Sequence, residues 1–136
     1  MQPTAAAATL LRRHGIQPSA QRVAVASYVL FTDEHPSADV VLARVKKGFP
    51  QLSRATVYNT LNTLVKKGLV REYVLAEGKI VYDPNVSRHH HFIDEETGEI
   101  HDIPWDELDV KKVDGLRGFD VSDYQVVLRG KARKRR

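Results

Sequence analysis

The sequence predicts an α+β protein made of two small domains, residues 1–82 and 83–136. Before Asp83-Pro84, apolar residues recur at helical spacing in segments rich in alanine and leucine. After it, short runs of β-branched residues dominate. A chain of 136 residues is long enough for one ordinary domain, or for two very small ones that share a dimer interface.

Four helices are predicted in the first half, and three of them end at a glycine, which favours helix termination. They cover residues 4–13, 20–31, 38–47 and 54–67, and the last three begin after the N-cap residues Ser19, Ser37 and Ser53. Two β-prone runs then flank Ala76-Glu77-Gly78, which predicts a hairpin with glycine in its turn. Helices followed by such a hairpin are typical of a winged helix-turn-helix.

The second half predicts a small α/β domain. Strands are expected at 90–94 and 99–103, followed by a helix over 105–116 and a last strand over 119–129. A sheet of this size buries too little apolar surface to be stable alone. We therefore expect it to pair with a second copy, as the dimerisation domain of a homodimer.

Charge and cysteine content restrict the function. Residues 1–82 hold 11 Lys/Arg against 5 Asp/Glu, whereas residues 83–128 hold 4 against 12. A basic first half suits a polyanionic partner, and a basic tail, RGKARKRR, ends the chain. With no cysteine, thiolate metal sites and disulfides are excluded, so any metal must have nitrogen and oxygen ligands. No apolar run predicts a membrane span or a signal peptide, and a cytoplasmic protein is expected.

The segment SRATVYNTLNTLVKKG is the predicted DNA-recognition helix. Its outward side chains are short and polar, as direct contact with base edges in the major groove requires. We expect double-stranded DNA to be contacted by this helix, by the preceding helix through Arg22 and by the hairpin through Lys79. The predicted contacts on the recognition helix are Arg54, Thr56, Tyr58, Asn59 and Asn62.

The segment YDPNVSRHHHFIDEETGEIHDI carries the predicted metal site. Alternate side chains share one face of a strand, so His89 and His91 point together and His90 points away. Asp102 on the partner strand reaches the same side, Asp83 ends the hairpin, and His35 comes from the first half. Such a mixed set of ligands suits Fe(II), Mn(II) or Zn(II). Ligands from both halves would let the metal fix the orientation of the DNA-binding domain.

The chain resembles the Fur family of metal-dependent repressors over nearly its whole length. The resemblance rests on HPSADV, SRATVYNTLNTLVKKGLV, KIVYD, HHHFID, GEIHDI and GFDVSDYQVVLRG. It implies a homodimer with an N-terminal winged helix, a C-terminal dimerisation domain and a regulatory metal site where the two meet. The family's five ligands correspond to His35, Asp83, His89, His91 and Asp102.

Aspartate at position 102 is similar to the peroxide-sensing PerR branch of the family, in which Fe(II) and hydrogen peroxide lead to oxidation of a liganding histidine. By resemblance, the oxidation-sensitive residues would be His35 and His89. The Irr branch of haem-responsive iron regulators carries the same aspartate. An Irr-like iron/haem-responsive regulator therefore remains an alternative, with His90 and His101 as the haem residues.

The chain departs from the family in lacking the cysteines of the structural zinc site, whose first pair falls at Asp94 and Thr97. Burial of apolar residues has to hold the dimer sheet instead, through Phe92, Ile93, Ile100, Ile103, Trp105, Val126 and Leu128. A second metal site of some members would fall near His90, His101, Asp109 and Tyr124, with tyrosine in place of a usual ligand.

Two other classes of function are compatible with parts of the sequence. A metalloenzyme is disfavoured because no general base beyond the ligands is evident, and no enzyme activity is expected. A DNA-binding architectural protein without a sensor would leave the histidines as surface residues.

Overall fold

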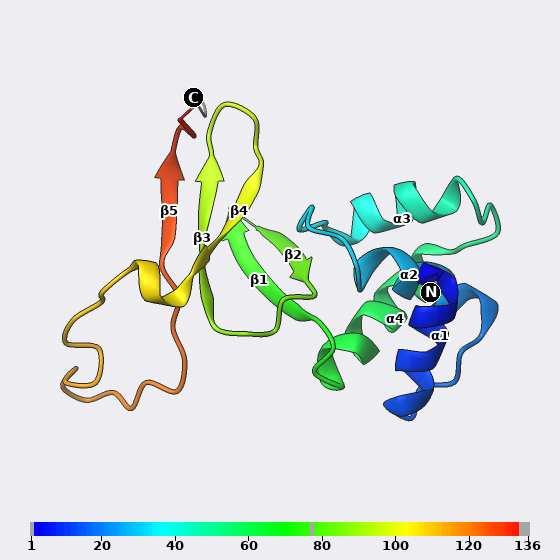
Figure 1. The fold of residues 1–136 in the computed structure, drawn as a ribbon, viewed down its shortest axis with the longest axis horizontal. Coiled ribbons are helices and arrows are strands. Elements are labelled where there is room, and N and C mark those ends of the chain that lie inside the picture. The colour runs from blue at the N-terminus through cyan, green and yellow to red at the C-terminus, as the bar shows by residue number, and fades with distance from the viewer. Residues whose placement is uncertain (1, 77, 134–136) are drawn as a thin grey trace. The chain divides into compact units, whose positions relative to one another are not determined.

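The computed structural model describes residues 2–76 and 78–133, so Glu77 of the predicted hairpin turn and the end of the basic tail lie outside the described residues. The chain divides into two compact units, Met1–Val86 and Ser87–Arg136, which are described separately (Figure 1). Asp83, the first residue of the predicted second domain, lies in the first unit. Within the described residues, every helix is too short or too polar to cross a membrane.

The first unit contains the four predicted helices. They are α1 (Pro3–Arg13), α2 (Ala20–Val29), α3 (Ala38–Lys46) and α4 (Arg54–Lys66). Ser19, Ser37 and Ser53 cap the last three, each accepting a hydrogen bond from the backbone N–H three residues later. These bonds satisfy donors that a helix start otherwise leaves unpaired.

The core of the first unit is formed by one apolar stripe from each helix. Leu11 of α1, Val25 and Val29 of α2, and Val41 of α3 have no exposed surface, and α4 contributes three more such residues, Val57, Leu61 and Leu64. Burying one such side chain is worth about 1.5–3 kcal/mol. The stripe of α4 leaves its opposite face to solvent.

Strands β1 (Arg71–Ala76) and β2 (Lys79–Asp83) form the predicted antiparallel hairpin. The pairing shifts register between Val74 and Ala76, next to the turn. The Tyr82 N–H donates to the Pro36 carbonyl at 2.9 Å, which ties β2 to the segment before α3. The predicted α+β class and N-terminal winged helix are confirmed.

The second unit is a three-stranded sheet of order β4-β3-β5. Strands β3 (His89–Asp94) and β4 (Ile100–Pro104) are antiparallel, whereas β5 (Val127–Gly130) runs parallel to β3. His91 lies opposite Asp102 on β4 and Val127 on β5. The β3–β4 turn is held by the Asp94 carboxylate, which accepts backbone N–H groups of Glu96 and Thr97 at 2.9 and 3.3 Å.

The segment between β4 and β5 differs from the prediction. The helix expected over 105–116 is wrong beyond a single 3-10 turn, Trp105–Glu107, and the strand expected over 119–129 is only Val127–Gly130. The sequence DVKKVDGLRG combines β-branched residues with two glycines, which are poor helix formers. Lys112 has a φ of 66°, a left-handed conformation that a helix does not allow.

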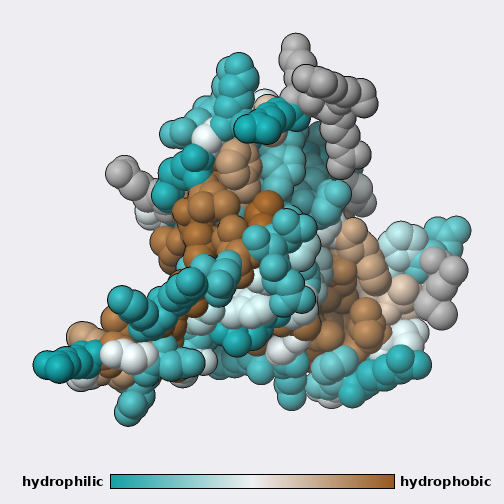
Figure 2. All heavy atoms as spheres, turned by 60° about the vertical axis from the view of Figure 1, so that its left-hand side comes forward, coloured by the Kyte–Doolittle hydropathy of each residue, from teal (hydrophilic) through white to brown (hydrophobic). Residues whose placement is uncertain are grey.

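The second unit contains no buried apolar side chain among residues 87–133. Its buried side chains are those of His89, His90, His91 and Asp94. The apolar residues predicted to hold the dimer sheet are half-buried, and Leu128 is exposed. Leu116 and Phe119 keep 52% and 73% of their surface exposed. Figure 2 shows one face of the molecule, on which groups of apolar side chains lie among polar ones.

Hydrogen bonds from the backbone N–H groups of Glu96 and Thr97 hold the pKa of Asp94 below its usual range. We therefore expect Asp94→Ala to lower the urea midpoint of the second unit at neutral pH, followed by the fluorescence of Trp105, the one tryptophan of the chain. Because a depressed pKa stabilises only while the group is ionised, the difference from wild type should shrink as the pH falls through the folded-state pKa of Asp94.

The matched control is Asp94→Asn, which keeps an oxygen acceptor without the charge. Its midpoint should change less with acid than that of wild type. A constant difference between wild type and Asp94→Ala down to pH 2 would show that folding does not lower the pKa of Asp94.

Candidate functional site

Helix α4 presents the polar side chains that the sequence predicts to contact DNA. Arg54, Tyr58, Asn59 and Asn62 are exposed, and Thr56 is half-buried. Thr56 is tied to the helix start, because its backbone N–H donates to the Ser53 hydroxyl. The N-terminal turn thus has a fixed backbone and exposed polar side chains, as insertion of a helix end into a major groove requires.

Arg54 has a partner that the sequence did not indicate. Its Nη1 donates to Oδ1 of Asp39 on α3, and this hydrogen bond and the Asp39 charge raise the pKa of Arg54. Both side chains are largely exposed, so the ion pair is weak in water and DNA can displace it. No sequence pattern joins these two residues, because they meet only through the packing of α3 beside α4.

The two other predicted DNA contacts lie on different elements of the same unit. Arg22 of α2 is half-buried and donates from Nη1 to the Gln17 carbonyl at 3.1 Å. It lines a hollow of about 550 Å³ together with Thr56 and Asn59 of α4. Lys79 is exposed at the start of β2. Arg22 therefore belongs to the same surface as the recognition helix.

The first unit brings together two of the predicted metal ligands. His35 Nε2 lies 3.1 Å from Asp83 Oδ2, and both side chains are buried. Asp83 also accepts the Asn85 N–H through its other oxygen, at 2.9 Å. His35 has a φ of 53°, which is uncommon for a residue with a side chain, and residues in such conformations cluster at functional sites. The turn thus holds His35 in a strained conformation beside a carboxylate.

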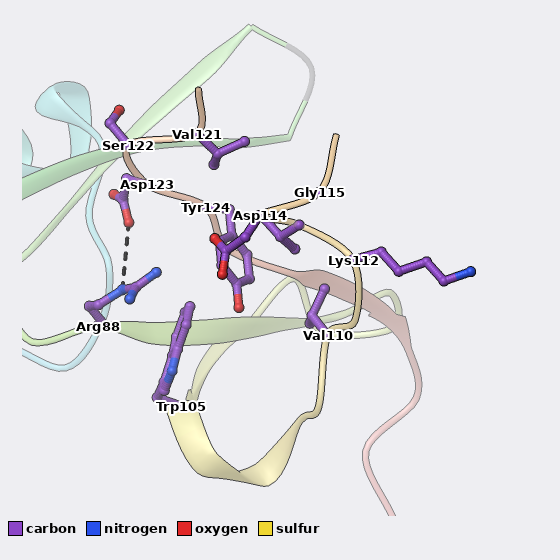
Figure 3. Close-up of a pocket in the computed structure, with 11 residues that line it drawn as sticks. Arg88, Trp105, Val110, Lys112, Asp114, Gly115, Val121, Ser122, Asp123 and Tyr124 are labelled. Atoms are coloured by element: carbon purple, nitrogen blue, oxygen red, sulfur yellow. Dashed lines mark ion pairs between the residues drawn. The ribbon is translucent and has the colours of Figure 1, made fainter. Parts of the chain in front are cut away.

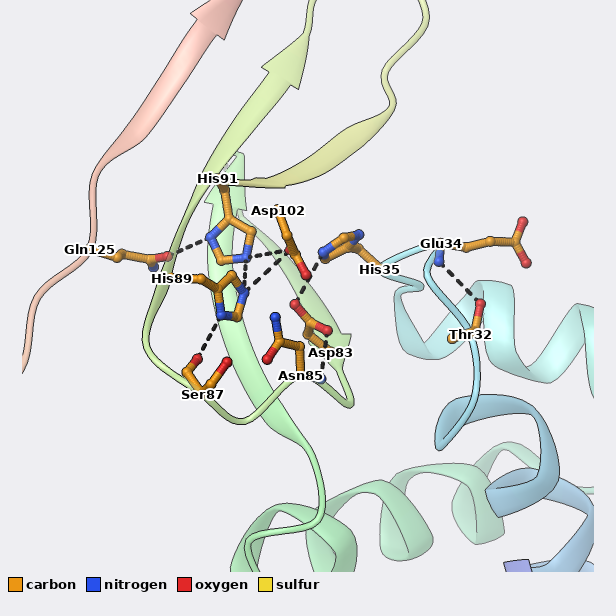
Figure 4. A network of polar contacts seen from close by, with 10 residues as sticks. All are labelled: Thr32, Glu34, His35, Asp83, Asn85, Ser87, His89, His91, Asp102 and Gln125. Carbon is orange, nitrogen blue, oxygen red and sulfur yellow. Dashed lines mark hydrogen bonds and ion pairs between the residues drawn. The ribbon is translucent and has the colours of Figure 1, made fainter. Parts of the chain in front are cut away.

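The second unit brings together the other three predicted metal ligands, His89, His91 and Asp102. His89 and His91 lie on one face of β3, with their Nε2 atoms 3.0 Å apart. Asp102 Oδ1 lies 3.3 Å from Nε2 of His89 and 3.5 Å from Nε2 of His91 (Figure 4). The histidines are buried, while Asp102 keeps about a third of its side-chain surface exposed. Strand alternation and the β3–β4 register account for this convergence.

The hydrogen bonds behind these rings determine their tautomers. His89 Nδ1 lies 2.7 Å from the Ser87 carbonyl, and His91 Nδ1 lies 2.7 Å from Oε1 of Gln125 (Figure 4). A carbonyl oxygen only accepts, so both Nδ1 atoms must carry the proton. In the neutral rings, both Nε2 atoms therefore direct a lone pair toward each other and toward the Asp102 carboxylate.

Two imidazole nitrogens and a carboxylate oxygen that converge in this way are the donor types that a divalent cation binds. Two nitrogens bound at right angles to one ion, each at about 2.1 Å, are about 3.0 Å apart. The observed separation of the two Nε2 atoms has this value. The donor set of the second unit therefore fits a divalent metal with nitrogen and oxygen ligands.

His90, on the other face of β3, has the opposite tautomer to His89 and His91. Its Nδ1 accepts the Val126 N–H at 2.9 Å, so the proton of the neutral ring is on Nε2. Burial lowers the pKa of His90, which favours the neutral form. The ring stacks on Trp105, with centroids 4.5 Å apart, and Arg88 lies over the same indole at 3.9 Å (Figure 3).

The residues suggested for a second metal site or for haem have other contacts. His101 lies beside Phe92 and pairs with Glu99 at 3.6 Å, and Tyr124 packs against Trp105. A hollow of about 390 Å³ adjoins Trp105 and Tyr124, and Arg88 on its lining lies over both rings and pairs with Asp123 (Figure 3). A haem ligated by His90 would have to displace the Val126 hydrogen bond or the stacked indole.

Comparison with known proteins gives one consistent result. A family model described as the ferric uptake regulator family matches residues 13–129. The peroxide-responsive repressor PerR of Staphylococcus epidermidis is 30% identical over 122 residues, which cover 88% of this chain and 81% of the relative.

Two solved structures agree with this match. The peroxide stress regulator of Campylobacter jejuni has a TM-score of 0.67 and 29% identity, covering 93% of this chain and 96% of that one. PerR of Streptococcus pyogenes has a TM-score of 0.54 and 30% identity, covering 97% of this chain and 92% of that one.

Arg54 is exposed at the start of α4, so we expect Arg54→Ala to weaken specific DNA binding by about 1–3 kcal/mol if the side chain forks to guanine. The duplex would be selected from a random pool by the wild-type protein with Mn(II). Affinity would be measured by fluorescence anisotropy on that duplex and on random DNA. The matched control is Lys46→Ala, an exposed cation on α3. An equal loss on both duplexes would instead make Arg54 a phosphate contact.

Proposed function

Because the chain belongs to the ferric uptake regulator family, we propose that it is a metal-dependent transcriptional repressor that acts as a homodimer. In this proposal it binds its operator when Fe(II) or Mn(II) occupies the His/Asp site, and it is released when the metal is lost or a liganding histidine is oxidised. The observation that carries the proposal is the convergence of two Nε2 lone pairs and the Asp102 carboxylate.

We propose that one metal takes His35, Asp83, His89, His91 and Asp102 as ligands. Two of them lie together in the first unit and three in the second. Neither set alone completes the coordination of a divalent ion that prefers five or six ligands, which supports a shared site. A shared metal would fix the orientation of each DNA-binding unit, and hence the spacing of the two recognition helices in a dimer.

The donor atoms of the proposed site indicate which metals it would bind. The chain has no thiolate, and its imidazole and carboxylate donors suit Fe(II) and Mn(II), with Zn(II) able to replace them in a purified protein. Fe(II) would supply the electrons that activate hydrogen peroxide. The residues of the chain hold the rings in place: Ser87 fixes His89, and Asp83 contacts His35. These two histidines are the proposed oxidation sites.

DNA recognition is assigned to the surface around α4. Arg54, Tyr58, Asn59 and Asn62 would contact base edges from their exposed positions, with Thr56 beside them. Arg22 and Lys79 would contact phosphates on either side of the recognition helix. Homologues named as repressors support this assignment.

Metal should govern DNA binding through His91. We expect wild-type protein to shift the selected duplex in a gel with Mn(II) and to release it with chelator. His91→Ala should remain a folded dimer by circular dichroism and sedimentation but lose the response to Mn(II). The matched control is His101→Ala, which removes an exposed histidine outside the proposed ligand set and should respond normally. Equal wild-type affinity with and without chelator would leave a DNA-binding protein without a metal sensor.

Peroxide should modify the proposed oxidation sites. After treatment of the Fe(II)-loaded protein with hydrogen peroxide, we expect peptide mass spectrometry to find a gain of one oxygen on His35 or His89. The Mn(II)-loaded protein serves as the control and should gain none. An unmodified Fe(II) protein that binds haem tightly would instead favour the iron- and haem-responsive regulator.

A further inference from the structure

Residues 125 and 126 make three hydrogen bonds to the histidine run of β3. Gln125 Oε1 lies 2.7 Å from His91 Nδ1, and the Val126 N–H donates to His90 Nδ1 at 2.9 Å. The Val126 carbonyl accepts the backbone N–H of His91 at 3.0 Å. These contacts span 34 to 36 residues of sequence and come from the segment that leads directly into β5.

The two side-chain contacts impose opposite tautomers on neighbouring rings. The Gln125 oxygen can only accept, so it keeps the proton of His91 on Nδ1 and leaves a lone pair on Nε2. The Val126 N–H can only donate, so it uses the Nδ1 lone pair of His90 and leaves the proton on Nε2. One ring is thereby prepared as a ligand, and the adjacent one is not.

The parallel pairing of β5 with β3 explains how one segment contacts both rings. Val127 lies opposite His91 in the register, and Gln125 is two residues earlier, so its side chain is on the same face as His91. Val126 contacts His90 through its backbone, so that bond does not depend on the residue type at 126. The contact with His91, in contrast, comes from the side chain of residue 125, and with Oε1 facing the ring it favours the tautomer protonated on Nδ1.

We propose that Gln125 is a positioning residue that holds His91 in the Nδ1–H tautomer, so that its Nε2 is available to the metal. The proposal rests on the proposed function, because it assigns Gln125 a role in the same metal site. Ring orientation by such an outer hydrogen bond is a general determinant of metal affinity, and its loss costs about 10–100-fold. Ser87 gives His89 the same tautomer through its backbone carbonyl, so of these two rings it is His91 whose tautomer depends on a side chain.

The test compares Gln125→Met, which keeps the length of the side chain without a strong acceptor, with Gln125→Glu, which keeps the acceptor. Long-range ¹H–¹⁵N correlation spectra of the full-length apoprotein, recorded at a pH where the imidazoles are neutral, report the tautomer of each histidine. Mn(II) affinity is measured separately, from the electron paramagnetic resonance signal of the free ion. Tyr124→Phe is the matched control, since it alters the neighbouring residue but not the contact with His91.

We expect wild type, Gln125→Glu and Tyr124→Phe to show His91 protonated on Nδ1. Gln125→Met should show a mixture of tautomers and a Mn(II) affinity lower by about 10–100-fold. Gln125→Glu should bind Mn(II) at least as tightly as wild type, because a carboxylate is the stronger acceptor. Gln125→Met with an unchanged His91 tautomer and an unchanged affinity would overturn the proposal, as would a wild-type His91 protonated on Nε2.

The two proposals fail separately in this experiment. A wild-type protein that shows the expected tautomers but does not bind Mn(II) would contradict the proposed function. The tautomer change in Gln125→Met would still establish what the glutamine does to the ring. Normal Mn(II)-dependent DNA binding in Gln125→Met, with His91 unaltered, would contradict only the role of Gln125.

Discussion

The convergence of two imidazole nitrogens and a carboxylate on one face of β3 is the constraint on which the second unit depends. The Nε2 atoms of His89 and His91 lie 3.0 Å apart, with an Asp102 carboxylate oxygen 3.3 Å from that of His89. Proteins tolerate buried acceptors only when a donor or a cation satisfies them. The strand geometry, the backbone carbonyl of Ser87 and the amide of Gln125 all maintain this arrangement. This arrangement supports the proposed cation site, in a unit whose buried side chains are polar.

The packing of the same unit leads to a similar conclusion. Between residues 87 and 133 only three histidines and Asp94 are buried, and the apolar side chains around them keep part of their surface exposed. The β3–β4 turn, where the family's structural zinc cysteines would begin, is held by hydrogen bonds to Asp94. This turn is stabilised locally, but it adds no core. We therefore expect the remaining stability to come from a second copy and from bound metal, both of which shift the folding equilibrium.

The sequence predicted the features that depend on local patterns. Serine caps placed the starts of three helices, and strand alternation placed His89 and His91 on one face with Asp102 opposite. The sequence-based prediction failed for residues 105–126. Apolar residues there have helical spacing, but two glycines disfavour a helix, and the described residues of this unit offer no buried apolar surface for a helix to pack against. Most helical stability in proteins comes from such packing.

Two contacts were beyond sequence reasoning because they join distant segments. Gln125 reaches His91 only because β5 runs parallel to β3, and Asp39 reaches Arg54 only because α3 packs beside α4. Neither glutamine nor aspartate has a spacing that marks it as a partner of these residues. His90 was predicted to point away from the metal face, but its stacking on Trp105 was not foreseen.

Crystals of the Mn(II)-loaded protein, with anomalous diffraction data to locate the ion, test the central claim most directly. The account predicts an anomalous peak between His89 Nε2, His91 Nε2 and an Asp102 oxygen, within about 2.0–2.3 Å of each. A peak bound through His90, or no peak on this face of β3, would contradict it.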